Sequence, residues 1–220
     1  MQQKYRSWIY IIVTSTIVMA SGVLWFLGKT TFIFWEDKIS LMTAAGQLAA
    51  LFGIILYALT IIFNKRISLL YNGYGSIGKA CVFHHWLGTI TLVLLLSHPL
   101  MSVFKYLYSS PRQAAELFIP GINWQTTWGV FSLALMILTA VVMYFFTVSG
   151  KVWKSYHTII ELAFIPAFIH FLLISSDVTT NHALRLYIMI IASLALISIF
   201  YGLMLRLIND ITHHKDSPTC

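Results

Sequence analysis

Long apolar runs alternate with short polar stretches along the whole chain. Six runs have about 20 residues or more, at about 8–28, 41–63, 81–104, 127–149, 156–175 and 184–207. A helix needs roughly 20 apolar residues to cross the hydrocarbon core of a bilayer. The runs lack the strict alternation of a half-buried strand. The pattern therefore predicts an all-α integral membrane protein, a bundle of six transmembrane helices.

The composition supports this class. Of the 220 residues, 59% are hydrophobic and only 10% are charged, which is more apolar surface than a soluble domain could bury. We expect one transmembrane domain over residues 1–220, with a short cytoplasmic tail at 208–220. The first run follows a basic start, as in a signal peptide, but it continues for about 20 uncharged residues without an A-x-A site. We interpret it as a retained span.

The residues that give the net charge of +7 are unevenly distributed between the connections on the two sides of the membrane. Basic residues gather at both chain ends and in two alternate connections: Lys4, Arg6, Lys65, Arg66, Lys79, Lys151, Lys154, Arg206 and Lys215. The other connections are nearly balanced, which is the positive-inside pattern with both termini cytoplasmic. We expect a multi-pass protein of the inner or plasma membrane, whose partner is the lipid bilayer and not nucleic acid.

Four histidines lie inside two of the apolar runs. His84 and His98 are 14 residues apart in the third run, and His157 and His170 are 13 apart in the fifth. At about 1.5 Å per residue, each pair spans roughly 20 Å. The third and fifth helices cross in the same direction, so one histidine of each lies at the cytoplasmic depth and one at the outer depth. Imidazole is costly in hydrocarbon without a partner. The pattern indicates two bis-histidine sites.

Haem b fits such sites best. Its iron takes two axial imidazoles from facing helices, and its apolar macrocycle suits a membrane interior. Zinc usually recruits four ligands, and the only carboxylate beside these histidines is Glu161. The sequence has no CxxCH motif for covalent attachment. We expect two b haems stacked between the third and fifth helices.

Helix geometry bears on whether the two histidines of each helix can point the same way, and on which histidine of the third helix is the ligand. Fourteen residues return to within about 40° of the starting face, whereas thirteen miss it by about 140°. Pro166 lies between His157 and His170. Because proline can re-phase a transmembrane helix, we predict a local distortion around 162–166. In the third helix, His85 is 13 residues from His98 and is the alternative to His84 as ligand; otherwise it neighbours the ligand or contacts a haem propionate.

Other residues could support the haems. Glu161, one turn after His157, could bond the ligand's second nitrogen, carry protons, or only meet polar groups in the bundle. Gly88, one turn after His84, would let a flat macrocycle approach, or let helices pack closely. Propionates could pair with arginines on the outer side and lysines on the inner side. These candidates are Arg112, Arg185, Lys79, Lys151 and Lys154.

The segments FHHWLG, LSHP and SYHTIIELAFIPAFIH resemble the ferric reductase-like transmembrane domain superfamily. It includes ferric reductases, NADPH oxidases and the haem-binding membrane subunit of bacterial methionine sulfoxide reductase systems. The resemblance covers about residues 40–207. It implies a six-helix core with two b haems that carry electrons across the membrane. The inner haem iron would be held by His84 and His157, and the outer haem iron by His98 and His170.

Fused members of that superfamily continue into a domain that binds FAD and NAD(P)H. The only GxGxxG string, GYGSIG at 73–78, lies between two apolar helix-length runs and does not follow a strand, so it is no dinucleotide-binding fingerprint. We therefore expect an oxidoreductase component that receives electrons from a separate flavoprotein or a quinol, with FAD or FMN only in that partner. The acceptor could be ferric iron, oxygen or a periplasmic reductase, and we expect the connection 105–126 to cap the outer haem. The alternative class is a non-redox transporter whose histidines carry protons or metal ions.

Overall fold

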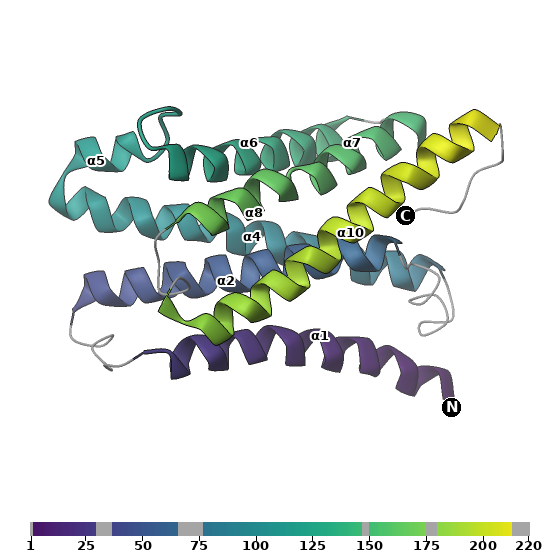
Figure 1. The fold of residues 1–220 in the computed structure, drawn as a ribbon, viewed down its shortest axis with the longest axis horizontal. Coiled ribbons are helices and arrows are strands. Elements are labelled where there is room, and N and C mark those ends of the chain that lie inside the picture. Colours follow the sequence, from purple (N-terminus) through teal and green to yellow (C-terminus); the bar gives the residue numbers. More distant parts are fainter. Residues whose placement is uncertain (1, 30–36, 66–76, 147–149, 175–179, 213–220) are drawn as a thin grey trace.

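The computed structural model describes residues 2–29, 37–65, 77–146, 150–174 and 180–212. Helices dominate these residues (Figure 1). They are α1 (Gln2–Leu27), α2 (Lys38–Lys65), α4 (Ile77–Ser109), α5 (Pro111–Glu116), α6 (Trp124–Phe145), α7 (Gly150–Leu162), α8 (Phe164–Leu173) and α10 (His182–Thr212).

Six helical stretches are long and apolar enough to cross a membrane, which confirms the predicted number of spans. They are Trp8–Leu27, Lys38–Asn64, Gly78–Leu107, Trp124–Phe145, Val152–Leu173 and His182–Ile208. The chain is thus a multi-pass membrane protein. The expected ends at 149 and 175 lie outside the described residues. α10 continues to Thr212, into the segment expected as a tail, because a helix need not stop where its apolar run stops.

The spans run up and down, so that α1 begins and α10 ends at the same end of the bundle (Figure 1). We call this the proximal end; α4 and α7 also begin there. At the opposite, distal end, α4 ends and α6 begins, and α5 connects them. Ser110 caps α5 by accepting the Gln113 N–H, and Pro111 occupies its first turn, where no helical N–H partner is needed. This short helix lies within the connection 105–126 and was not predicted.

The packing around α4 is uneven. α2 is the most buried span, with Ile55, Tyr57, Ala58 and Ile61 each at most 2% exposed. α4 packs mainly against α2, while α8 packs mainly against α6. Among the described residues, α4 touches α6 sparsely and makes still fewer backbone contacts with α7 and α8. Side chains, and not close backbone packing, therefore connect α4 to the α6–α8 side of the bundle.

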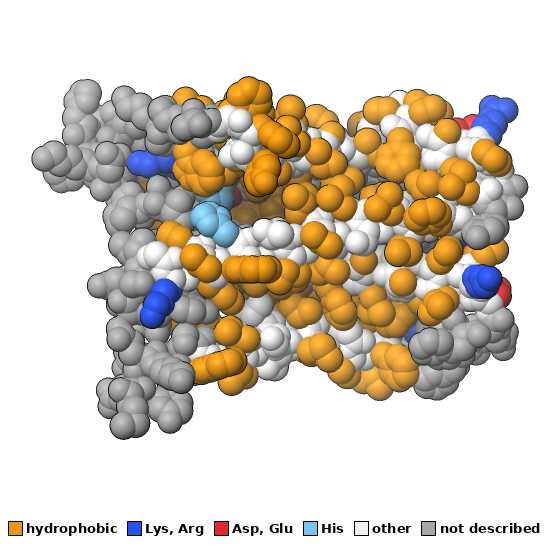
Figure 2. Space-filling view, turned by 180° about the vertical axis from the view of Figure 1, so that it is seen from behind, with side chains coloured by type: hydrophobic (Ala, Val, Ile, Leu, Met, Phe, Trp, Pro, Cys, Tyr) orange, Lys and Arg blue, Asp and Glu red, His pale blue; other side chains and the backbone are white. Residues whose placement is uncertain are grey.

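The surface matches a lipid environment. Hydrophobic side chains cover the middle of the face in Figure 2, and lysine and arginine lie towards its ends. Large apolar side chains such as Leu138 (63% exposed) and Ile197 (62%) point outward. Such a continuous apolar belt is costly in water but is expected against acyl chains. At the distal end, acidic side chains lie beside the basic ones (Figure 2), as for Arg112 and Glu116.

Candidate functional site

The four histidines form two facing pairs, one near each end of the bundle. The ring centroids of His84 and His157 are 5.5 Å apart, with planes tilted by 47°. Those of His98 and His170 are 6.5 Å apart, with a tilt of 54°. Two imidazoles on opposite sides of one metal ion, with metal–nitrogen bonds of about 2.0 Å, would place their centroids roughly 6 Å apart. Both pairs therefore have the spacing of imidazoles that share a metal.

The distal pair is oriented by backbone carbonyls of two other helices. His98 Nδ1 lies 3.0 Å from the carbonyl oxygen of Gly46 in α2. His170 Nδ1 lies 2.7 Å from that of Gln125 in α6. A carbonyl can only accept, so each imidazole donates from Nδ1 and keeps Nε2 as its lone-pair nitrogen. Metal-binding histidines commonly carry a hydrogen bond of this kind on their second nitrogen.

In the proximal pair, the ring that faces His157 is that of His84. Its side chain is 3% exposed, and Nδ1 has no hydrogen-bond partner among the described residues. His85 is exposed; its ring lies 5.8 Å from that of His84 and meets Trp153 edge-on at 6.4 Å. The geometry thus favours His84 over His85 as the partner of His157. A buried polar nitrogen without a partner is rare in proteins and calls for an explanation.

The predicted distortion between His157 and His170 is confirmed. α7 ends at Leu162 and α8 begins at Phe164, so the span is divided at Ala163. Two side chains from other helices donate hydrogen bonds to backbone carbonyls next to this break. The Tyr57 hydroxyl donates to Ile160 O, and Ser132 Oγ donates to Ala163 O at 2.6 Å. Sequence reasoning missed both residues, because they lie 103 and 31 positions from their acceptors and belong to no local motif.

Glu161 is buried beside α2. Its side chain is 3% exposed, and Oε1 accepts a 2.5 Å hydrogen bond from Asn64 Nδ2. Of the interpretations considered for Glu161, polar contact within the bundle is therefore borne out. Asn64, which sequence reasoning did not single out, lies in the last turn of α2 and supplies the donor that a buried carboxylate needs.

Two glycines lie near histidines. A Cβ on Gly129 of α6 would fall 3.0–3.1 Å from three atoms of the His170 ring, so a larger residue would require this ring to shift by a few tenths of an ångström. A Cβ on Gly88, one turn after His84, would have no other heavy atom within 4 Å. There is therefore open space next to Gly88, one turn from His84, whereas the backbone of α6 at Gly129 packs directly against the His170 ring.

The candidate cations have different surroundings. Arg112 is 88% exposed at its side chain and pairs with Glu116 at 2.8 Å within α5. Arg185 is exposed in the first turn of α10, and Lys79 is exposed in the first turn of α4. The side chain of Lys151 lies outside the described residues. A basic residue not predicted for the site lies near the proximal pair: Arg206 of α10 donates to the hydroxyl of Thr158, the residue after His157.

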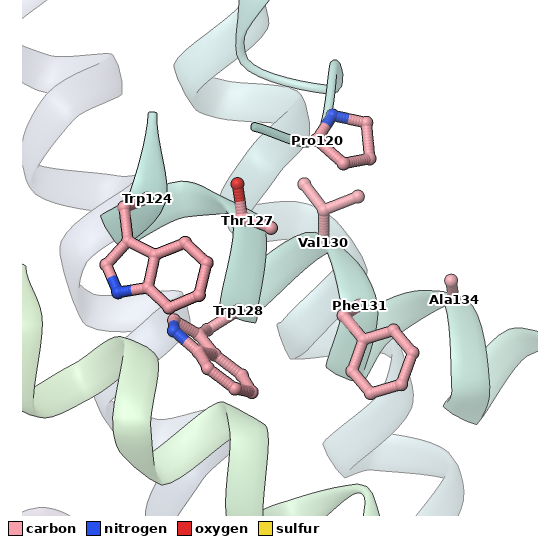
Figure 3. Close-up of a pocket in the computed structure, with 7 residues that line it drawn as sticks. All are labelled: Pro120, Trp124, Thr127, Trp128, Val130, Phe131 and Ala134. Carbon is pink, nitrogen blue, oxygen red and sulfur yellow. The ribbon is translucent and has the colours of Figure 1, made fainter. Parts of the chain in front are cut away.

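The surface of the bundle is hollowed on one face, towards the proximal end (Figure 2). Figure 2 shows histidine side chains bordering this hollow towards the proximal end. A separate apolar pocket of about 240 Å³ lies at the distal end of α6 (Figure 3). It is lined by Pro120, Trp124, Thr127, Trp128, Val130, Phe131 and Ala134, and so by none of the four histidines.

No protein-family model matches the chain, and no curated protein matches it. The description of the site therefore rests on its own geometry: two facing histidine pairs, each with one ring from α4 and the other from α7 or α8.

Proposed function

We propose that this chain carries electrons across a membrane through two b haems, each held by one histidine pair. The observation that carries the proposal is the pairing itself. His84 with His157, and His98 with His170, have ring centroids 5.5 and 6.5 Å apart at two depths of one bundle. They bridge helices whose backbones barely touch. Close packing of α4 against α7 and α8 would instead have left no room for a group between them.

The residues present fit haem b. Each pair offers two imidazoles, which would hold one haem iron between them. Apolar side chains such as Leu87, Phe164 and Phe168 are buried in the same bundle, and the space beside Gly88 is open. When bound, haem b supplies one-electron chemistry between ferric and ferrous iron.

The protein itself contributes position and insulation. The carbonyl of Gly46 fixes the His98 ring, and that of Gln125 fixes the His170 ring. Along α4 the two levels are separated by roughly 20 Å, as the helical rise over 14 residues requires. Phe164 and Phe168, stacked with centroids 6.3 Å apart, help to exclude water between the levels. The chain thus sets the distance between the two centres.

The distribution of charge supports an orientation of the chain in the membrane. Lys79, Lys154 and Arg206 belong to the proximal end, and the positive-inside rule makes this end cytoplasmic. We assign the donor, a separate flavoprotein or a quinol, to the proximal side. We assign the acceptor to the distal side, where α5 and the segment after it connect α4 to α6. Ferric iron is the default acceptor, and a periplasmic reductase is the alternative.

Sealed liposomes test the proposal. Purified protein is inserted into vesicles that contain ferricyanide, and dithionite is added outside. We expect wild-type protein to accelerate the loss of internal ferricyanide colour at least tenfold over empty vesicles, and His98→Ala to abolish the acceleration. Transfer by His98→Ala at the wild-type rate would contradict the proposal, as would wild-type vesicles that behave like empty ones.

A further inference from the structure

We infer that Tyr57 and Ser132 are positioning residues, which hold the break at Ala163 and so align both histidines of α7 and α8 with those of α4. The inference rests on the proposed function, because alignment matters most when each pair shares one iron. It deepens that function by assigning a role to two residues whose hydroxyls donate to backbone carbonyls and not to an imidazole.

A break is required by helix geometry. His157 and His170 are 13 residues apart, so an ideal helix would point them about 140° away from each other. His84 and His98 lie on the continuous helix α4 and differ by only about 40°. Since both pairs face each other in the structure, the span carrying His157 and His170 must change phase between them.

The break leaves backbone groups that need partners. Pro166 has no N–H to offer Leu162 O, and the bond from Ala167 N to Ala163 O is stretched to 3.4 Å. In the apolar interior of a membrane, water cannot compensate for a lost helical hydrogen bond. Such a break persists only where neighbouring helices satisfy the loosened carbonyls.

Tyr57 and Ser132 do this from two sides. Tyr57 of α2 is 2% exposed and donates to Ile160 O, before the break. Ser132 of α6 is 3% exposed and donates to Ala163 O, at the break. The Tyr57 ring also meets Phe164 edge-on, with centroids 5.2 Å apart, which fixes the first residue of α8.

The same two helices also hold the distal imidazoles. α2 contacts His98 through Gly46 O, and α6 contacts His170 through Gln125 O. α6 therefore contacts α8 near both of its ends. Ser132 donates to Ala163 O before α8 begins, and Gln125 O accepts from His170 in its last turn. We therefore regard α2 and α6 as the frame that sets the orientation of α7 and α8 relative to α4.

The test compares Tyr57→Phe, Ser132→Ala and the double variant with matched controls. Thr139→Val removes another buried hydroxyl of α6, whose bond goes to Leu135 O within its own helix. Tyr187→Phe removes a tyrosine hydroxyl that bonds to Ile17 O, between α10 and α1. Each protein is purified in detergent, its haem is counted per chain, and both haems are examined by electron paramagnetic resonance and by redox titration.

We expect the double variant to lose one haem per chain, or to show an altered largest g-value and a midpoint shift of at least 59 mV, a tenfold change in a one-electron equilibrium. Ser132→Thr, which keeps a hydroxyl, should restore the wild-type signals, and both controls should match wild type. If the double variant does not accumulate as folded protein, the single variants Ser132→Ala and Ser132→Thr are compared instead. The inference then requires Ser132→Ala to change the haem content, g-values or potentials and Ser132→Thr to leave them as in wild type.

Unchanged haem content, g-values and potentials in these variants would overturn the inference, and so would equal changes in the controls. Wild-type protein without haem would instead overturn the proposed function. The two failures are therefore distinguishable in one set of samples.

Discussion

The imidazoles of His98 and His170 face each other between α4 and α8, and each is anchored at Nδ1 by a carbonyl of a different helix. Their ring centroids are 6.5 Å apart. The anchors, Gly46 O and Gln125 O, lie at 3.0 and 2.7 Å. Both rings are therefore held in one tautomer and one orientation before any ligand arrives. Preorganisation of this kind reduces the entropy lost when a metal binds.

Substituting Gly129 should weaken the distal site. In Gly129→Ala, the new methyl group would lie about 3 Å from the His170 ring, and the ring must move. Overpacking of this kind costs about 1–3 kcal/mol, so we expect the distal haem to bind roughly tenfold more weakly or worse. Haem titration of apo-protein measures this. Gly78→Ala, where a Cβ meets no atom within 4 Å, is the control and should bind both haems normally.

Filling the space beside Gly88 should affect the proximal haem and not the fold. Because a Cβ at Gly88 meets no neighbouring heavy atom within 4 Å, we expect Gly88→Leu to be accommodated without haem and to leave the apo-protein's melting temperature within a few degrees of wild type. If haem occupies this space, the same leucine should remove most of the proximal haem. Full haem content in Gly88→Leu would show that the macrocycle lies elsewhere.

The two adjacent histidines of α4 should respond differently to substitution. His84 is buried and faces His157, whereas His85 is exposed. We expect His84→Leu to lose the proximal haem and His85→Leu to keep both haems. Haem counted per chain gives the answer. The opposite pattern would identify His85 as the ligand and require a large rearrangement of the first turns of α4.

The bond between Asn64 and Glu161 should contribute to stability. In Asn64→Leu, the carboxylate of Glu161, 3% exposed, loses a donor at 2.5 Å. Loss of a buried hydrogen-bond partner costs about 1–3 kcal/mol. Thermal unfolding in detergent should show a clearly lower midpoint. The contrast is Arg112→Ala, which breaks an exposed pair with Glu116 and should change stability by about 0–1 kcal/mol. Equal effects would argue that burial does not strengthen the Asn64 bond.

The spans and the histidine pairing could be predicted because their signals are strong and local. An apolar run of about 20 residues has few alternatives to a transmembrane helix. The 14-residue and 13-residue spacings, together with the direction of each span, were enough to match His84 with His157 and His98 with His170. Pro166 marked the position of the helix break to within a few residues.

The supporting contacts could not be predicted, because they join residues far apart in the sequence. Ser132 is one of several hydroxyl residues in apolar runs, and only the packing of α6 on α8 selects it for Ala163 O. Gly46 and Gln125 act through backbone carbonyls, which every residue possesses. The helix α5 had a local signal, a serine followed by proline, but its six residues are too few for a periodic pattern.

The most direct test of the central claim is a dithionite-reduced minus oxidised spectrum with haem counted per chain. It should be recorded on detergent-purified wild-type protein and on His98→Ala and His157→Ala. We predict the α and Soret bands of b haem, close to two haems per wild-type chain, and the loss of one haem in each variant. A wild-type chain without haem after haem-replete expression would contradict the account, as would variants that keep both haems.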